Sequence, residues 1–224
     1  MGRVWDRLVR DRRGAVTLEY AFVAPLLIAL IMAILNVALI YLAQEGLETA
    51  TESAARLIMT GDAQTMTTGS GSSAVTGLSA NQFKTAVCSG LSGTDVNGSA
   101  VSYAGSLPPF LSCNNLSVNV EIFPTGCTSP TISAPTYTYN SSGTLTSTGS
   151  NYGNETCDGT SNDGAGLSGA QGKLVVVQLS YLWPTLASPW GLGASNQPGR
   201  NRLLVSTYVF TIENYLCASG STTC

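Results

Sequence analysis

The chain contains no histidine among its 224 residues. Histidine is the usual general base beside serine and cysteine nucleophiles and a common zinc ligand, so its absence argues against both kinds of site. The cysteines form no C-x-x-C pair, which is the thiolate spacing typical of structural zinc sites. Gly69-Ser70-Gly71 is followed by Ser72-Ser73-Ala74, without the third glycine of a dinucleotide fingerprint. We therefore predict no enzyme activity, no cofactor and no metal site.

Charged residues are also scarce, at 10% of the chain, and they are unevenly placed. The segment before Gly14 holds five arginines and two aspartates, a net charge of +3, so the rest of the chain carries −6. The positive-inside rule places such a basic N-terminus in the cytoplasm and the bulk of the chain across the membrane. Because the large portion is acidic, we predict no nucleic-acid binding.

A long apolar run occupies residues 21–43, and Asn36 is its one strongly polar side chain. A helix of this length, at about 1.5 Å per residue, covers the roughly 30 Å hydrocarbon core of a bilayer. The run therefore predicts a transmembrane helix. A cleaved secretory signal is the alternative, but its apolar region is typically about 7–15 residues long and ends at an A-x-A-like site. This run is longer and lacks a good site.

Glu19 stands at the entry to the apolar run, where a carboxylate is costly unless something stabilises it. One explanation is its place in the first turns of a helix, near unpaired backbone N–H groups and the positive end of the helix dipole. The other is the spacing to Gly14. If the chain were cut after Gly14, Ala15 would carry a free α-amine one helical turn from Glu19.

The N-terminal motif resembles a known processing site. Arg12-Arg13-Gly14-Ala15 and Glu19-Tyr20, followed by the apolar run, are similar to type IV prepilins, specifically to the short-leader Tad (Flp) pilus system. Further segments resemble the TadE-like minor pilins of that system: residues 21–27, 47–51, 54–61, 83–88, 113–118, 175–184 and 203–210. The resemblance covers most of the chain apart from about residues 125–172, and its N-terminal part is the more specific.

The resemblance implies that the chain is a minor pilin or pseudopilin cut by a prepilin peptidase between Gly14 and Ala15. In the wider type IV pilin family, a glutamate at the position of Glu19 pairs with a neighbouring subunit's α-amine, and we expect Tyr20 beside it to share this subunit contact. The expected partners are the inner membrane, the peptidase, other pilin-like subunits and the Tad secretion machinery. The alternative is an uncleaved single-pass inner-membrane protein whose periplasmic domain binds a secretion partner.

All six cysteines follow the apolar run: Cys88, Cys113, Cys127, Cys157, Cys217 and Cys224. Their position suits an oxidising periplasm, where disulfides persist. Six cysteines allow 15 pairings, and the sequence alone does not choose among them. The resemblance implies a bond between Cys88 and Cys113. The pairs Cys127–Cys157 and Cys217–Cys224 are further candidates that no spacing argument supports.

The helix is expected to continue beyond the membrane, from Ala15 to about Thr60. Apolar residues recur at helical spacing after residue 43, whereas Glu45, Glu48 and Glu52 share another face, which is either solvated or a docking surface. Gly61 is a plausible stop. We therefore divide the chain into a basic leader (1–14), the helix (15–60), a Ser/Thr/Gly-rich linker (61–80) and a periplasmic α+β domain (81–224).

Three segments of that domain read as strands. Residues 116–122 alternate between apolar and polar, as in a half-buried strand; a second strand lies near residues 174–183, and a third at 203–213 carries Leu203, Val205, Thr207 and Val209 on one face. Residues 81–88 are a candidate second helix. The predicted fold class is α+β and pilin-like: a long helix whose amphipathic end packs on a small antiparallel sheet, with long irregular loops.

Residues 125–172 are rich in Ser, Thr, Asn, Gly and Pro, which predicts a long exposed loop. Glu155, Asp158, Asn162 and Asp163 in this loop offer oxygen ligands, but they do not fit the EF-hand spacing, and a solvated loop is favoured over a calcium site. Two aromatic turns, Trp183-Pro184 and Pro189-Trp190-Gly191, predict packing at the sheet edge, with a partner contact as the alternative.

Overall fold

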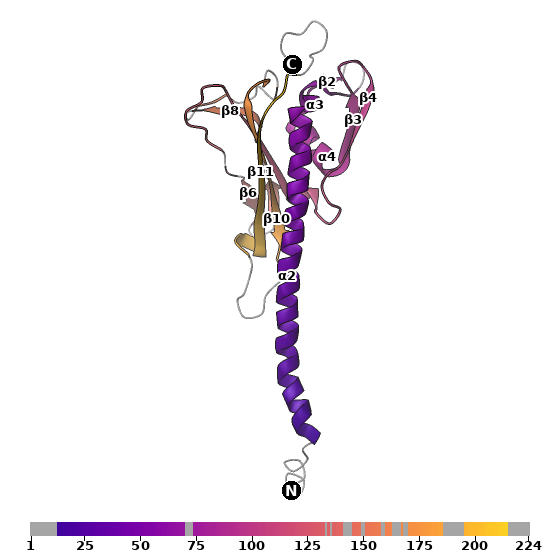
Figure 1. Ribbon diagram of the computed structural model, residues 1–224, viewed down its shortest axis with the longest axis vertical. Helices are drawn as coiled ribbons and strands as arrows, with labels where there is room; N and C mark the ends of the chain where they lie inside the picture. The colour runs from indigo at the N-terminus through magenta and orange to yellow at the C-terminus, as the bar shows by residue number, and fades with distance from the viewer. Residues whose placement is uncertain are drawn as a thin grey trace, which may run out of the picture.

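The computed structural model describes residues 13–69, 74–132, 134, 136–140, 145–148, 151–157, 160–162, 167, 170–185 and 195–214. One long helix, α2 (Arg13–Met59), dominates the molecule. Its N-terminal half extends alone, and its C-terminal half lies between a large sheet on one side and a second helix with a small sheet on the other (Figure 1). We call the folded part, formed by the described residues from Ile40 onward, the head. This arrangement confirms the predicted α+β class and the long N-terminal helix.

The course of α2 follows from its sequence. The helix passes through Pro25, and Gly61 follows its last turn with φ 85°, a left-handed conformation that glycine adopts without strain. Below residue 40 the apolar side chains are exposed; above it, Ala43, Leu47, Ala50, Ala54 and Ile58 are at most 2% exposed. Their spacing of three or four residues places them on one stripe, which faces the core of the head.

Small residues let other elements approach α2 closely. At Gly46, a Cβ atom would lie 2.7 Å from Cγ of Pro108, which is closer than packed atoms allow. The absence of a side chain at Gly46 therefore makes room for the loop that carries Pro108 and Phe110. Ala43, Ala50 and Ala54 serve the same purpose on the neighbouring face, because their side chains are short and fully buried.

The large sheet has five strands in the order β11-β10-β5-β8-β9. They are β5 (Leu116–Phe123), β8 (Asn151–Cys157), β9 (Thr160–Asn162), β10 (Leu174–Pro184) and β11 (Asn201–Thr211). The predicted strands at 116–122, 174–183 and 203–213 are confirmed within a few residues. The sheet is mixed and not purely antiparallel, because β8 pairs with β5 in the parallel direction.

Strand β5 corrects the expectation of a half-buried strand, since all eight of its residues are buried. Its polar residues, Ser117, Asn119 and Glu121, are buried on the sheet face opposite the core. The hairpin of β6 (Tyr137–Tyr139) and β7 (Leu145–Thr148), which comes from the long loop, lies on this face. Tyr137 lies beside Ser180 of β10, and its burial raises the pKa of its hydroxyl to about 12. The described hairpin of the loop therefore covers the outer face of the sheet around Ser180.

Strand β11 confirms the predicted shared face and shows which face of the strand is buried. Leu203, Val205, Thr207 and Val209 do share one face, but that face is turned away from α2, and Val209 is 54% exposed. The core side is formed by the alternate residues, of which Leu204, Ser206 and Phe210 are buried. A period of two decides which residues share a face but not which face is buried.

The segment predicted as a linker, residues 61–80, is packed where the structure describes it. It contains α3 (Asp62–Thr65), β1 (Thr67–Thr68) and β2 (Val75–Thr76), and it buries Ala63, Met66 and Leu78. Strands β1 and β2 join β3 (Gly90–Thr94) and β4 (Ala100–Ala104) in a four-stranded sheet of order β2-β1-β3-β4. The segment is thus an integral part of the head.

The predicted short helix is confirmed as α4 (Ala80–Ser89). Ser79 caps it: the hydroxyl accepts a hydrogen bond from the backbone N–H of Gln82, and the Gln82 side chain accepts one from the backbone N–H of Ser79. This reciprocal cap satisfies two otherwise unpaired donors at the helix start. Phe83 is fully buried and packs against Tyr152 of β8 with ring centroids 5.3 Å apart, so α4 covers the β8 side of the large sheet.

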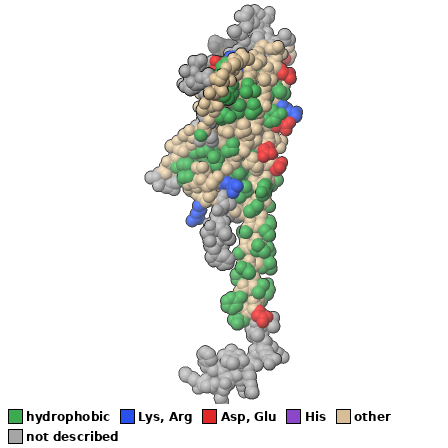
Figure 2. All heavy atoms as spheres, turned by 60° about the vertical axis from the view of Figure 1, so that its left-hand side comes forward, with side chains coloured by type: hydrophobic (Ala, Val, Ile, Leu, Met, Phe, Trp, Pro, Cys, Tyr) green, Lys and Arg blue, Asp and Glu red, His purple; other side chains and the backbone are tan. Residues whose placement is uncertain are grey.

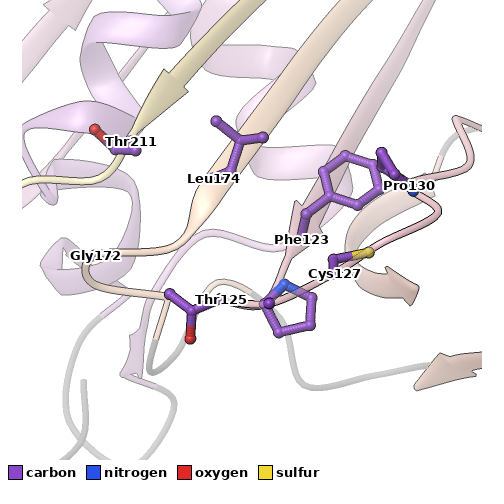
Figure 3. A pocket seen from close by; sticks show the side chains of 9 residues that line it. Phe123, Thr125, Cys127, Pro130, Gly172, Leu174 and Thr211 are labelled. Carbon is purple, nitrogen blue, oxygen red and sulfur yellow. The ribbon is translucent and has the colours of Figure 1, made fainter. Parts of the chain in front are cut away.

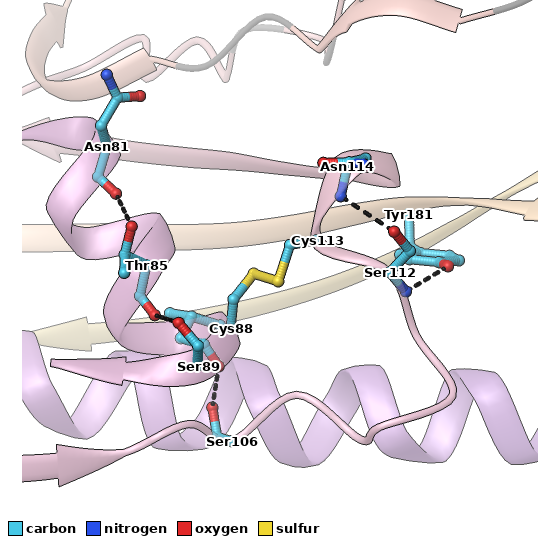
Figure 4. Close-up of a disulfide and its surroundings, with 10 residues drawn as sticks. Asn81, Thr85, Cys88, Ser89, Ser106, Ser112, Cys113, Asn114 and Tyr181 are labelled. Atoms are coloured by element: carbon cyan, nitrogen blue, oxygen red, sulfur yellow. Dashed lines mark hydrogen bonds between the residues drawn. A yellow bond between two sulfur atoms is a disulfide. The ribbon is translucent and has the colours of Figure 1, made fainter.

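Two disulfide bonds cross-link the head, Cys88–Cys113 and Cys127–Cys157. Both are among the candidate pairs given in the sequence analysis. Cys88 lies in the last turn of α4, and Cys113 opens the short helix η2 (Cys113–Asn115) just before β5, as Figure 4 shows. Beside this bond, the backbone N–H of Ser112 donates to the Tyr181 hydroxyl at 3.0 Å, so the same junction is also held to β10. Cys217 and Cys224 lie outside the described residues.

Leu47 provides a direct test of the packing between α2 and the sheet. It is fully buried, so we expect Leu47→Ala to lower the free energy of unfolding of the head by about 2–5 kcal/mol. The measurement is chemical denaturation of the purified chain in detergent, followed by near-ultraviolet circular dichroism. Leu174→Ala is the matched control, because Leu174 is 39% exposed and its truncation leaves a smaller cavity. Equal losses for the two variants would contradict the packing described.

Candidate membrane anchor and assembly surface

The exposed half of α2 is the most unusual surface of the molecule. Between Leu18 and Leu39 nearly every large apolar side chain is 44% or more exposed, and Figure 2 shows these side chains around the bare helix. Isolated exposed leucines are common on proteins, but a continuous apolar cylinder in water is not. Among the described residues, this is the helix long and apolar enough to cross a membrane. It is therefore a candidate membrane anchor.

The dimensions of the cylinder match a bilayer. Residues 18–39 extend over ~33 Å at the α-helical rise, compared with about 30 Å for a hydrocarbon core. Tyr20 and Tyr41 flank it and are 73% and 69% exposed. Tyrosine is enriched at both membrane–water interfaces, where its ring meets lipid and its hydroxyl meets water. Tyr41 was missed by the sequence analysis, although its distance of 21 residues from Tyr20 was a usable signal.

Glu19 lies at the open end of this cylinder. Its side chain is exposed between apolar neighbours, and within the described residues it forms no ion pair in its own chain. Gly14 and Ala15 lie in the first turn of α2, although their side chains are outside the described part. The backbone thus places the proposed cleavage point about one turn below the Glu19 carboxylate. Any cationic partner of Glu19 at this level has to approach from outside the described chain.

A second polar feature runs along the upper part of α2, where Glu45, Glu48 and Glu52 are exposed on one face. Glu52 pairs with Arg56 at 2.6 Å, and Gln44 donates a hydrogen bond to Glu48 at 3.0 Å. Exposed pairs of this kind contribute little to stability, typically 1 kcal/mol or less. Within this chain the acidic face is solvated.

The other candidate residues from the sequence, the calcium ligands and the aromatic turns, do not form one site in the described part. Of the four residues weighed as calcium ligands, Glu155 forms an ion pair with Lys173, Asn162 lies in β9, and Asp158 and Asp163 are outside the described residues. No group of three or more His, Cys, Asp or Glu side chains could hold a metal ion within the described part. Of the two aromatic turns, Trp183 packs on the core beside Tyr181, whereas residues 189–191 lie outside the described part.

A shallow hollow of about 280 Å³ lies at the end of the head far from the bare helix, between Phe123, Pro130, Leu174 and Thr211 (Figure 3). Its lining is apolar apart from two threonines and the backbone, and Cys127 in its wall is bonded to Cys157. The described residues that line the hollow include no carboxylate, lysine or arginine side chain.

Comparison with known proteins bears on the helix. Residues 14–56 match the family model of TadE-like proteins. The TadE-like segment therefore begins at Gly14 and ends within the buried stretch of α2, which bears out the resemblance stated from the N-terminal motif. It spans roughly a fifth of the chain, and the head beyond it lies outside the match. No curated protein and no solved structure matches the chain.

The TadE-like helix generates a simple prediction for membrane insertion. We expect Leu30→Arg to reduce membrane integration strongly, because a charge near the middle of a bilayer costs roughly 2.5–3.5 kcal/mol or more. The assay is the fraction of chain that resists carbonate extraction from membranes. Thr49→Arg is the control, since Thr49 is exposed on the same helix but above the apolar cylinder. Equal extraction of both variants would rule out residues 18–39 as the anchor.

Proposed function

We propose that this chain is a minor pilin or pseudopilin of the Tad (Flp) pilus system, anchored in the inner membrane by α2 and processed by a prepilin peptidase. The observation that carries the proposal is the TadE-like match starting at Gly14, on a helix whose large apolar side chains between Leu18 and Leu39 are exposed and form the apolar cylinder. A structural subunit also suits a chain without histidine and without clustered metal-binding side chains in its described part.

The orientation of the proposed subunit follows from charge and redox chemistry. The arginine-rich leader stays in the cytoplasm under the positive-inside rule, and the acidic head is exported. Two disulfides in the head support this orientation, because disulfides form and persist in an oxidising periplasm. The head would then stand in the periplasm above the inner membrane, on the C-terminal half of the helix that anchors it.

Glu19 has a specific role in the proposed assembly. Cleavage between Gly14 and Ala15 removes the arginines and leaves a positively charged α-amine at the start of α2. In a bundle of such helices, the amine of one subunit neutralises Glu19 of its neighbour, with Tyr20 beside the pair. In surroundings of low dielectric constant, an unpaired carboxylate is strongly disfavoured, so this pairing selects the axial offset between neighbouring helices.

The first test is processing itself. We expect the protein recovered from membranes that contain an active prepilin peptidase to begin at Ala15, as shown by N-terminal sequencing and intact mass. In membranes without the peptidase the leader is retained. If the leader stays intact in both samples, the pilin proposal fails. The alternative, an uncleaved anchored binding module for a secretion partner, would then take its place.

The second test separates assembly from cleavage. We expect Glu19→Gln to leave processing unchanged and to reduce co-isolation with the pilin-like subunits of the same system. The loss is about ten- to a hundredfold, as expected for a charge-assisted interaction of roughly 1.5–3 kcal/mol. Quantitative mass spectrometry of detergent-solubilised complexes measures the effect. Glu45→Gln is the matched control, because Glu45 is an exposed glutamate on the same helix above the apolar cylinder. Equal effects of the two substitutions would exclude a specific role for Glu19.

A further inference from the structure

The lower end of the large sheet reaches the level of the apolar cylinder. Strand β11 runs alongside α2: the Gln44 side-chain amide donates to the Val205 carbonyl at 3.1 Å, and the Glu213 backbone N–H donates to the Met59 carbonyl at 3.3 Å. Three residues of strand below Val205 span ~10 Å, which equals six or seven residues of helix. Arg202 therefore lies beside the turn of α2 around Val37, which is still exposed and apolar.

The chemistry at this end of the hairpin suits a membrane interface. Arg202 is paired in register with Trp183, and Arg200 follows Pro198 and Gly199 in an exposed turn. The turn is held in place, because Thr185 donates both its backbone N–H and its hydroxyl to the Arg200 carbonyl, at 2.9 and 2.7 Å. Figure 2 shows basic side chains where the head borders the bare helix. Tryptophan and arginine are side chains that place apolar atoms in lipid and polar atoms at the headgroups.

We propose that the β10–β11 hairpin end, formed by Trp183, Arg200 and Arg202, rests on phospholipid headgroups at the outer surface of the membrane that α2 crosses. Trp183 then lies at the same interface as Tyr41, and the two arginines attract phosphate groups. The head is held against the bilayer at two places, by α2 and by the hairpin. This proposal rests on the membrane anchoring proposed above.

A second copy of the chain fits the two arginines less well than lipid does. Apart from Glu19 at the far end of the cylinder, the acidic groups on α2 begin at Glu45, which is above Gln44, whereas Arg202 lies ~10 Å below Gln44. A neighbour standing at the same height therefore presents its apolar cylinder to the arginines and not its glutamates. The headgroup layer is the negatively charged surface found at this level.

Fluorescence quenching by brominated lipid tests the proposal on the full chain. The chain has three tryptophans, so Trp5→Phe with Trp190→Phe leaves Trp183 as the single reporter. The protein is reconstituted into bilayers of phosphatidylcholine, with or without phosphatidylglycerol, that carry bromine on acyl carbons near the headgroup. Two reporters in an otherwise tryptophan-free chain calibrate the signal: Tyr41→Trp at the proposed interface, and Tyr208→Trp farther up β11.

We expect Trp183 to be quenched within about twofold of the Tyr41→Trp reporter, and Tyr208→Trp to remain unquenched. Substituting Arg200→Gln together with Arg202→Gln should weaken the headgroup contact about thirtyfold in the anionic bilayer, lowering quenching of Trp183 but not of Tyr41→Trp. Arg200→Gln alone should give a smaller change in the same direction. Because Arg200 is exposed, this single variant can still be measured if the double variant does not fold.

The outcomes separate this proposal from the anchoring on which it rests. Quenching of Tyr41→Trp without quenching of Trp183 overturns the headgroup contact and leaves the anchor intact. Absence of quenching at both reporters overturns the anchor as well. If Trp183 is protected from quenching only at high protein-to-lipid ratios and the arginine substitutions abolish that protection, the arginines bind a second copy and the lipid proposal is wrong.

Discussion

The structure depends on one packing interaction, between the small-residue stripe of α2 and the inner face of the five-stranded sheet. Ala43, Leu47, Ala50, Ala54 and Ile58 are buried there, opposite strands whose inward residues are mostly Val, Ile and Leu. Alanine at three of these positions brings the helix backbone close to the sheet. Backbone and Cβ atoms of α2 therefore form much of the contact. The same helix has no such stripe below residue 40, where its apolar residues face outward in all directions. A single continuous helix thus changes its surroundings within one turn.

The opposite face of the sheet is also buried, and it carries polar residues of β5. Asn119 donates to Glu121 at 3.2 Å, and both side chains are buried on the face that carries the β6–β7 hairpin. Burial of polar groups costs less when they have hydrogen-bonding partners, and this bond gives each of the two side chains one. The low apolar content of residues 125–172 therefore does not mean that this segment lacks contacts with the sheet. It suits a sheet face that is itself polar.

This cover marks the limit of what the sequence could predict. The helix, its stop at Gly61, the helix α4 and the three long strands were readable because each depends on a local periodicity or on a conformational preference. The burial of β5 on both faces and the inward face of β11 were not readable. Both depend on which distant segment covers a surface, and a period of two leaves that choice open. For the site, the apolar cylinder and Glu19 were visible in the sequence, whereas the hairpin end became visible only when β11 was placed alongside α2.

The continuity of α2 also bears on the choice between an assembly subunit and a tethered binding module. Residues 13–59 form one helix with no break between the apolar cylinder and the head, and the segment after Gly61 is packed and not a free linker. The head consequently has a set height, with Met59 ~27 Å above Tyr41 along the axis. A module that captures soluble partners gains from a flexible tether, which lets it search space. A subunit whose helix packs in a bundle benefits instead from a stiff connection, because each axial offset between helices is then transmitted to the heads. The stiff connection seen here therefore supports the assembly role.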